Sequence, residues 1–395
     1  MEIFNVFQII VLTFLGLAVL YIFIFSIASL FYKEKKYNNI NNDKKIAVLV
    51  PGYKEDAVIV EVAKLALKQD YPSNLFDVVI IADSFQETTL HKLRSLPLKL
   101  IEVSFENSTK AKALNKAMER LERDYDIAVV LDADNVMASG FLSRINAVFE
   151  QNVVAVQGHR TAKNVNTSWA ILDAISEEIN NNIFRKGHRV LGLSSAIIGS
   201  GMAFSYKYFK SIMSNVDAIG GFDKEIELIM LKEGRKILYL NDAIVYDEKV
   251  QKAEVFGNQR RRWLSAQLHY FRKDIFIAFK HLILKGNVDY FDKAIQFIQP
   301  PRVLLLGAVV GLSFIFVLMN RFLDNNIAYS IAWVALFASC FLSFVFSVPK
   351  AFYNLNTLKA LASLPRGMFM MLLSLLKIKG ANKSYIHTPH SSEKT

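Results

Sequence analysis

Two aspartates, Asp132 and Asp134, are the residues whose type and spacing first suggest chemistry. They follow the apolar run 129–131 and are separated by one residue. Carboxylates held this close repel each other unless a cation lies between them. Mg²⁺ and Mn²⁺ prefer such oxygen ligands and commonly bridge carboxylates to phosphates. The same pattern also fits a strand end capped by two solvated residues, so the rest of the chain must decide between the two interpretations.

The elements around this pair predict an open α/β sheet. Apolar, strand-like runs cover residues 45–53, 77–83, 98–104 and 127–131, and helical patterns cover 55–69 and 110–121. Alternating strands and helices indicate a parallel, doubly wound, Rossmann-like sheet. We expect a turn at Pro51–Gly52 to break the first run. Asp83 ends the second strand-like run, and Asp132 comes directly after the fourth. Ligands bind at the carboxyl ends of parallel strands such as these.

The second half of this region is expected to add further strands and helices. Helices are predicted over 135–149, 168–189 and from 222 to a cap at Gly234, and short strands over 153–157, 236–240 and 243–246. Between them, Gly199-Ser200-Gly201 would let the backbone approach a ligand closely, although a plain turn explains it equally well. His159 and Arg160 are candidates for lining an acceptor site, with a structural role as the favoured interpretation.

Three apolar runs indicate a membrane protein. Residues 3–32 exceed the length of about 20 residues that a spanning helix needs, and Lys33, Lys35 and Lys36 follow them. This placement of charge predicts an external N-terminus and a cytoplasmic domain after the anchor. Residues 302–319 and 327–348 predict a transmembrane hairpin after the break at Pro300–Pro301. The run 368–376 is too short to span and predicts an interfacial or re-entrant helix.

Composition narrows the class of protein. The chain has 395 residues, 52% of them hydrophobic, and a net charge of +11. That charge suits an anionic membrane surface or a phosphorylated substrate, and we expect no nucleic-acid partner because zinc-finger and RNA-binding patterns are missing. The single Cys340 excludes disulfides and cysteine metal sites. The predicted units are 1–45 (anchor and linker), 46–265 (α/β domain), 266–301 (interfacial helices), 302–379 (hairpin and short helix) and 380–395 (polar tail).

An ordered set of motifs resembles glycosyltransferase family 2. The set comprises VPGYKED at 50–56, Asp83, KAKALNKA at 110–117, DAD at 132–134, GSG at 199–201, an acidic helix start at 222–228 and QRRRW at 259–263. It covers about residues 46–265 and is most similar to the membrane-bound members related to the synthases of cellulose, hyaluronan and poly-N-acetylglucosamine. The resemblance implies a GT-A fold and inverting transfer from a nucleoside-diphosphate sugar, commonly a uridine nucleotide, assisted by Mg²⁺ or Mn²⁺.

The resemblance also implies roles for individual residues. Those assigned to the nucleotide and its phosphates are Pro51, Tyr53, Glu55, Asp83, Lys110, Asn115 and Asp132. Lys112 departs from the family pattern, which has glycine there. Asp134 is the expected direct metal ligand, with Asp132 as its partner.

The general base is open between two residues of one helix. Asp223 lies at the family's distance of eleven residues before Gly234, but Phe222 stands where a glutamate is usual. Glu225 is the alternative. Residues two apart on a helix do not share a face, so we expect one base and favour Asp223.

Gln259, Arg262 and Trp263 match the family's QxxRW pattern, which implies contact with the diphosphate and the acceptor sugar. Arg260 and Arg261 are instead expected to form a basic patch at the membrane surface. The motif favours elongation of a polysaccharide or another membrane-associated glycan. Three spans favour single-sugar transfer to a lipid-linked acceptor, unless the protein oligomerises or works with an export partner. A third hypothesis is a catalytically lapsed membrane scaffold.

Overall fold

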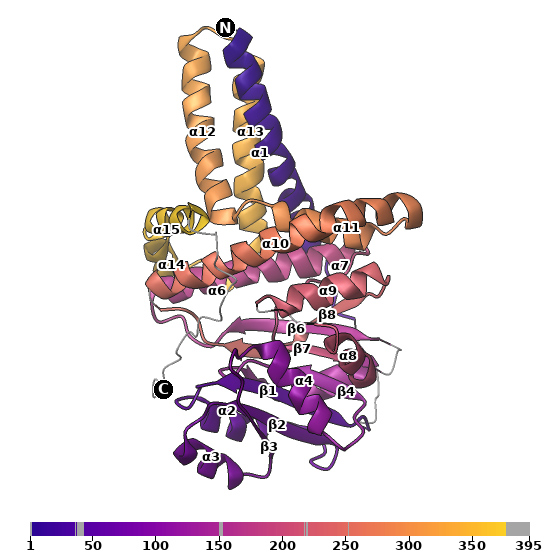
Figure 1. Cartoon of the computed structure of the whole chain (residues 1–395). Coiled ribbons are helices and arrows are strands. Elements are labelled where there is room, and N and C mark those ends of the chain that lie inside the picture. Colours follow the sequence, from indigo (N-terminus) through magenta and orange to yellow (C-terminus); the bar gives the residue numbers. More distant parts are fainter. Residues whose placement is uncertain are drawn as a thin grey trace.

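One mixed sheet of eight strands organises the α/β part of the molecule (Figure 1). The computed structural model describes residues 2–35, 37, 43–149, 153–216, 218, 220–251 and 253–376. The strand order is β3-β2-β1-β4-β7-β6-β8-β5. The strands are β1 Ile46–Tyr53, β2 Phe76–Asp83, β3 Lys99–Val103, β4 Ile127–Val130, β5 Val136–Met137, β6 Ala155–Ala162, β7 Met202–Ser205 and β8 Ile237–Asp247.

The expected parallel arrangement is confirmed for β1 to β4 and for the pair β6 and β8. Strand β7 runs antiparallel to both β4 and β6, and β5 runs antiparallel to β8, so the sheet as a whole is mixed. The turn predicted at Pro51–Gly52 is wrong, because β1 continues to Tyr53 and pairs with β2 throughout. A proline is tolerated there since β4 pairs with β1 only up to Leu49, which leaves the end of β1 with a single neighbour.

Helices cover both faces of the sheet. They are α2 Ile59–Ala66, α3 Glu87–Arg94, α4 Lys110–Arg120, α5 Phe141–Phe149, α8 Tyr206–Met213 and α9 Phe222–Lys232. The alternating side chains of β1 divide between two cores: Ala47 and Leu49 pack with residues of α4, α8 and α9, whereas Val48 and Val50 pack with residues of α2 and α5. This two-sided burial explains why the strands are apolar throughout rather than alternating.

The helix expected over 168–189 is present but irregular. It consists of α6 Ser168–Asn180, a π-helical segment Asn181–Gly187 and α7 His188–Val190. π-Helical turns inside a longer helix often mark functional sites because they redirect side chains. Helix α6 lies between the sheet and the long helix α10 Ala253–Lys285 (Figure 1).

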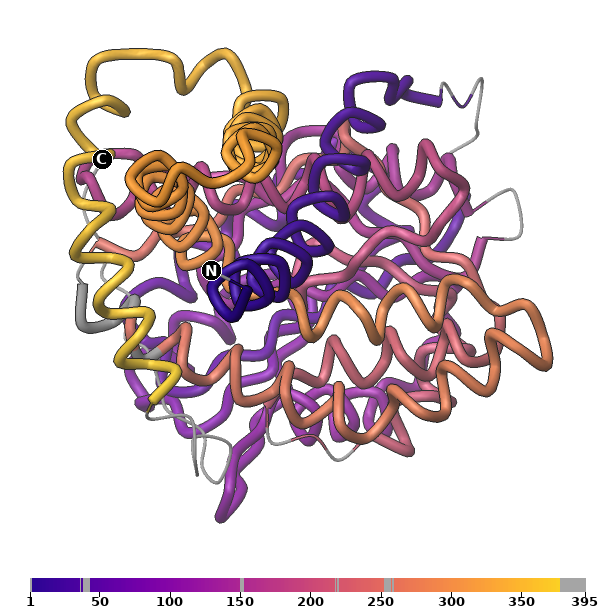
Figure 2. The backbone as a smooth tube through the Cα atoms, turned by 90° about the horizontal axis from the view of Figure 1, so that it is seen from above, coloured from indigo at the N-terminus to yellow at the C-terminus, as the bar shows by residue number. Residues whose placement is uncertain are grey.

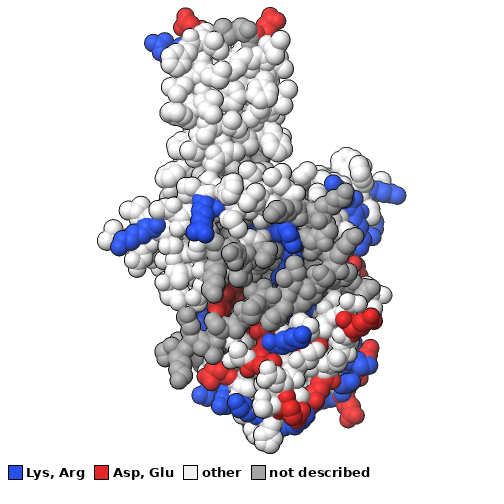
Figure 3. Space-filling view, turned by 60° about the vertical axis from the view of Figure 1, so that its left-hand side comes forward, with Lys and Arg blue, Asp and Glu red and all other residues white. Residues whose placement is uncertain are grey.

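A layer of helices lies across the top of the α/β part, and a column of three helices rises from it (Figures 1 and 2). The layer contains α10 Ala253–Lys285, α11 Val288–Ile298, α14 Leu355–Leu361 and α15 Leu364–Leu376. The column contains α1 Glu2–Ser29, α12 Arg302–Phe322 and α13 Ile327–Ser347, and each is long and apolar enough to cross a membrane. On the face shown in Figure 3, charged side chains appear on the column only at its tip.

Helices α14 and α15 meet at 46°, and together they could count as a fourth, bent span by length and composition. In Figure 1 they lie beside the base of the column rather than along it, as expected of an interfacial helix. The tail from 380 onward lies outside the described residues.

The column and the helix below it are tightly joined at Gly187. A side-chain carbon on Gly187 would lie 2.2 Å from the backbone oxygen of Phe25 in α1, so a glycine is required there. The next residue, His188, stacks on the Phe25 ring with the ring centroids 3.7 Å apart. The anchor helix is therefore packed directly against the π-helical segment.

Candidate active site

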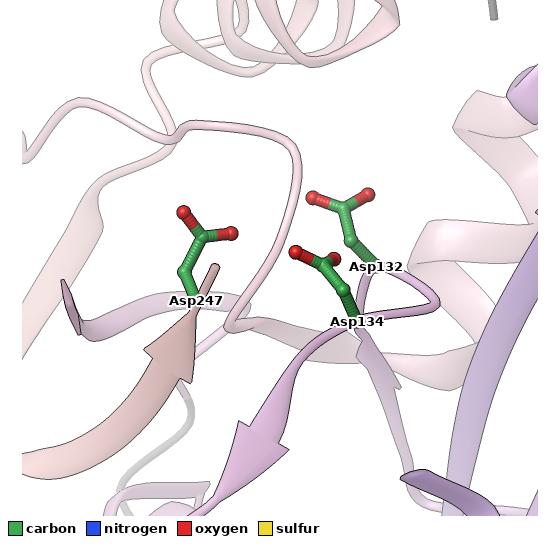
Figure 4. Close-up of side chains that lie close together, drawn as sticks. All are labelled: Asp132, Asp134 and Asp247. Atoms are coloured by element: carbon green, nitrogen blue, oxygen red, sulfur yellow. The ribbon is translucent and has the colours of Figure 1, made fainter. Parts of the chain in front are cut away.

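Three aspartates meet at the edge of the sheet (Figure 4). Asp132 and Asp134 lie in the loop after β4, and Asp247 ends β8; each offers one oxygen within 4.8 Å of the others. The Asn135 amide donates to Asp134 at 3.2 Å and to Asp247 at 2.9 Å, which fixes two of the carboxylates. Three carboxylate oxygens are a suitable ligand set for Mg²⁺ or Mn²⁺. The aspartate pair is therefore part of a group able to hold a metal ion.

Sequence reasoning missed Asp247. We expected two separate strands over 236–240 and 243–246, whereas the structure has one continuous β8 that absorbs a register shift against β6. The signal was present in Ile244-Val245-Tyr246-Asp247, an apolar run that ends in a carboxylate as the runs before Asp83 and Asp132 do.

Two cations face the aspartates. Lys110, the first residue of α4, donates to Asp132 and also to the Gly199 backbone oxygen at 2.8 Å. Arg160 on β6 places Nη1 3.6 Å from Asp132 and 3.5 Å from Asp247. Burial alone would raise the pKa of Asp132, but Lys110 and Arg160 together hold that pKa below its ordinary value.

Arg160 thus lies among the aspartates, and its ion pairs are also compatible with the structural role that we favoured for it. His159 points elsewhere: its ring nitrogens lie 2.9 Å from Asn241 and 3.0 Å from Glu178. A buried network of ion pairs holds the Arg160 guanidinium in place. Its Nε donates to Glu177 at 2.8 Å, and the buried Lys249 contacts both Glu177 and Asp247.

One cavity of about 820 Å³ opens beside this group. Its sheet-side wall is formed by Pro51, Tyr53, Glu55, Asp83 and Lys110 together with Asp132 and Asp134. The backbone is strained where β1 and β2 end, since Lys54 and Ser84 have φ of 55° and 59°. Such conformations are costly for residues other than glycine and concentrate at functional sites.

The opposite wall of the cavity comes from helices. Asp223 at the start of α9 lines it, as do Gln259, Arg262 and Trp263 on α10. Gly199 lies against Asp223, with a positive φ of 84° that places its backbone next to the carboxylate. The structure therefore brings the DAD, GSG and QRRRW motifs and the acidic helix start around one space.

Two predicted site residues are absent from the cavity lining in the described part of the chain. The Asn115 amide donates to the Met213 backbone oxygen at 2.9 Å, which ties α4 to the end of α8. Glu225 lies 3.4 Å from Lys273. Asn115 thus positions a helix rather than reaching the space where a nucleotide would bind, and the geometry favours Asp223 over Glu225 as the residue facing a substrate.

Two further residues line the cavity although the sequence did not predict them there. Arg260 lines the cavity, pairs with Asp173 at 2.7 Å and lies over the Trp263 ring at 4.5 Å, so it does not belong to an exposed basic patch. Glu227, one helical turn after Asp223, is buried in the wall and pairs with Lys293 at 2.8 Å. Burial raises the pKa of Glu227, although Lys293 opposes the shift.

The arrangement suits a phosphorylated ligand. Lys110, Arg160 and a divalent cation on the aspartates would neutralise phosphate charge. Asp223 lines the same cavity. The cavity thus combines cations and metal-ligating carboxylates, which suit a diphosphate, with the further carboxylate of Asp223.

Comparisons with known proteins agree with this geometry. Residues 43–266 match the family model described as glycosyltransferase like family 2. The chain is 26% identical over 259 residues to a beta-monoglucosyldiacylglycerol synthase of Nostoc sp., covering 62% of this chain and 52% of the relative. It is 24% identical over 286 residues to an N-acetylglucosaminyltransferase of Rhizobium meliloti, covering 68% of this chain and 65% of that one. The chain thus spans about half the length of the first relative.

Among solved structures, the mannosyltransferase PcManGT from Pyrobaculum calidifontis, in complex with GDP-Man and Mn²⁺, shares the fold. Its TM-score is 0.52 at 18% identity, with 86% of this chain and 97% of that chain covered. The expected GT-A architecture is confirmed by this likeness. Since the family model matches more than half of the chain, the protein belongs to the glycosyltransferase-like family 2.

Proposed function

We propose that the protein transfers one sugar, with inversion, from a nucleoside-diphosphate sugar to a lipid-linked acceptor in the membrane. The observation that carries the proposal is the shared cavity. It extends from the aspartate group to α10 and α11, the helices that lie at the base of the apolar column (Figure 1). A soluble donor would enter at the sheet edge and a membrane-held acceptor at the helices.

The donor half follows from the chemistry of the residues present. Asp132, Asp134 and Asp247 would hold Mg²⁺ or Mn²⁺, which when bound neutralises charge on the departing diphosphate. Lys110 and Arg160 contribute permanent positive charge to the same phosphates. Pro51, Tyr53, Glu55 and Asp83 would receive the nucleoside, with uridine as the expected base.

The acceptor half places Asp223 as the general base. Its carboxylate would take the proton from the acceptor hydroxyl as that oxygen attacks the anomeric carbon, and the diphosphate would leave from the opposite face. Arg262 suits contact with a diphosphate oxygen, and the Trp263 indole suits packing against a sugar face. Gln259 lies one turn earlier on the same helix, where its amide would orient either partner.

The packing of the column favours a single transfer over export of a polymer. Phe316 and Trp333 stack at 4.6 Å between α12 and α13, and Gln8 of α1 pairs with Asn320. These contacts link the three helices to one another. The similarity to the Nostoc beta-monoglucosyldiacylglycerol synthase, which is by name a glycolipid synthase, supports a lipid acceptor. Elongation of a polysaccharide remains the second candidate because Gln259, Arg262 and Trp263 face the cavity together.

Product analysis tests the proposal. Purified protein in lipid nanodiscs is incubated with radiolabelled nucleotide-sugars and Mg²⁺ or Mn²⁺, and products are resolved by thin-layer and size-exclusion chromatography. A labelled lipid carrying one sugar is the expected result. A long polymer would replace the proposal with chain elongation. Donor binding without turnover on any acceptor would instead identify a lapsed scaffold.

We further propose that the catalytic domain faces the cytoplasm of a cell membrane, because Lys33 and Lys35 follow α1. Cys340 is the only cysteine, so single cysteines placed in a Cys340→Ala background would report sidedness to a membrane-impermeant thiol reagent. Labelling of a domain cysteine in intact cells would reverse the proposed orientation.

A further inference from the structure

Two arginines at the membrane side of the cavity, the buried Arg185 and the half-buried Arg302, have no carboxylate partner among the described residues. Arg185, in the π-helical segment, lines the cavity and is 1% exposed. Its guanidinium donates to the Ala196 backbone oxygen and to the Asn181 side chain. Arg302, the first residue of α12, donates to the backbone and hydroxyl oxygens of Ser176. In the described part of the chain, neither guanidinium has an acidic oxygen within 4.0 Å.

Arg185 lines the cavity, and Arg302 adjoins the lining residues around it without being one of them. Arg302 lies over the Phe184 ring at 5.8 Å, and Ser176, Phe184 and Arg185 all line the cavity. The Arg302 guanidinium feels the positive charges of Arg260 and Arg185. Its Nη1 is buried and has no hydrogen-bond partner among the described residues.

The nearby acids are already paired with other cations. Asp173 is paired with Arg260, and Glu177 is paired with Arg160 and Lys249. Glu227 is paired with Lys293. Burying an unpaired cation is costly, and repulsion between buried cations adds to the cost. An arrangement that retains two such cations beside a cavity is explained if an anionic ligand supplies the missing charge.

The location and the donor geometry define the ligand's class. The wall adjoins α12, which enters the apolar column, and guanidinium groups bind phosphate oxygens through paired N–H donors. We propose that this wall binds the phosphate group of a membrane lipid, which presents the acceptor to the active site. The inference rests on the proposed function and adds the chemical class of the acceptor lipid. It also gives Arg185 and Arg302 a role separate from that of the diphosphate-binding Lys110 and Arg160.

A lipid-binding experiment tests the inference separately from catalysis. Purified full-length protein in dodecyl maltoside micelles is mixed with radiolabelled phosphatidic acid, and retained lipid is counted after gel filtration. Unlabelled phosphatidic acid should displace it, whereas phosphatidylcholine, diacylglycerol and oleate should displace it poorly. Equal displacement by oleate would mean that any negative charge suffices. Displacement by inorganic phosphate at the same concentrations as by phosphatidic acid would mean a free phosphate site. Either result overturns the inference.

The matched variants are Arg302→Gln and Arg321→Gln, at the two ends of the same helix. Thermal stabilisation by UDP and Mn²⁺, measured on each preparation, shows that the variant has folded. We expect Arg302→Gln to weaken phosphatidic acid binding about tenfold, the loss typical of one hydrogen bond to a charged group, and Arg321→Gln to leave it unchanged. Equal binding by both variants would overturn the inference. Failure of UDP to stabilise the unmodified protein would instead count against the proposed function.

Discussion

Asp132 follows β4 and Asp247 ends β8, two strands that are not neighbours in the sheet, yet their carboxylate oxygens approach within 4.8 Å. The contact arises because β8 extends past the register shift opposite Gly158 and His159 and delivers Asp247 to the loop after β4. A metal site at this point therefore depends on the pairing of β8 with β6 and with β5 as well as on the DAD motif.

Asp247→Ala should weaken metal binding about tenfold or more, comparable to the loss from Asp134→Ala, because each removes one ligand of the same ion. Mn²⁺ affinity measured by isothermal titration in the presence of UDP would check this. Asp242→Ala, on the same strand but paired with Arg144 at 3.2 Å, is the control and should bind Mn²⁺ normally. Normal affinity in Asp247→Ala would exclude Asp247 as a ligand.

Asp223→Asn should lower the rate of sugar transfer by about 10²–10⁴-fold, the usual contribution of a general base, while donor binding persists. Single-turnover rates and UDP binding, measured on the same samples, separate the two effects. Glu225→Gln should remain near the unmodified rate, since Glu225 lies against Lys273 and not in the cavity lining. The reverse order of effects would assign the base to Glu225.

Arg262→Lys should reduce transfer about tenfold, because a lysine retains the charge but loses the planar pair of donors that suits phosphate oxygens. Arg261→Lys is a stringent control: it is the same change at the neighbouring residue, which is not among the residues lining the cavity. Steady-state kinetics over a range of donor concentrations would show the difference. Similar losses in both variants would point to a general effect on α10.

Acid should destabilise the contact between α1 and α11, in which Tyr21 donates to Asp292. Burial acts to raise the pKa of Asp292, but hydrogen bonds from His188 and Tyr21 hold that pKa below its ordinary value. A carboxylate with a lowered pKa contributes stability that is present above its ordinary pKa of about 3.9 and is lost as the pH falls further. Thermal inactivation in detergent, followed from about pH 7 down to about pH 3, should show this loss.

Asp292→Asn removes the titrating group and supplies the control. The variant should be less stable than the unmodified protein at neutral pH, and the gap should narrow as the pH falls below about 4. A constant gap over the whole range would show that Asp292 does not carry the acid sensitivity.

Local patterns were enough to predict the elements that position the donor site. The apolar runs before Asp83 and Asp132 predicted β2 and β4, and the carboxyl-end rule placed their aspartates at one edge. The spanning helices followed from length and hydropathy in the same way. The roles of the individual site residues stay predictions, although the structure brings nearly all of them around one cavity.

The features that sequence reasoning missed are those set by long-range packing. Asp247 joins the aspartate group because the end of β8 pairs with β5, the short strand that follows the DAD loop. Arg160 occupies the site because β6 extends beyond the strand expected over 153–157. Strand β7 was not predicted, since Met202–Ser205 is too short for its alternation to be recognised, and its antiparallel direction follows from the fold rather than from its residues.

The contact between Phe25 and Gly187 connects catalysis to the thickness of the bilayer. Helix α1 has 28 residues and is about 42 Å long at 1.5 Å per residue, whereas the hydrocarbon core is about 30 Å thick. A helix that exceeds the core tilts, and the tilt changes with the lipids around it. Because Gly187 has no room for a side chain against α1, we expect that tilt to be passed to the segment carrying Phe184 and Arg185. We expect the rate of sugar transfer to vary with lipid chain length, with the effect residing at the acceptor side of the cavity.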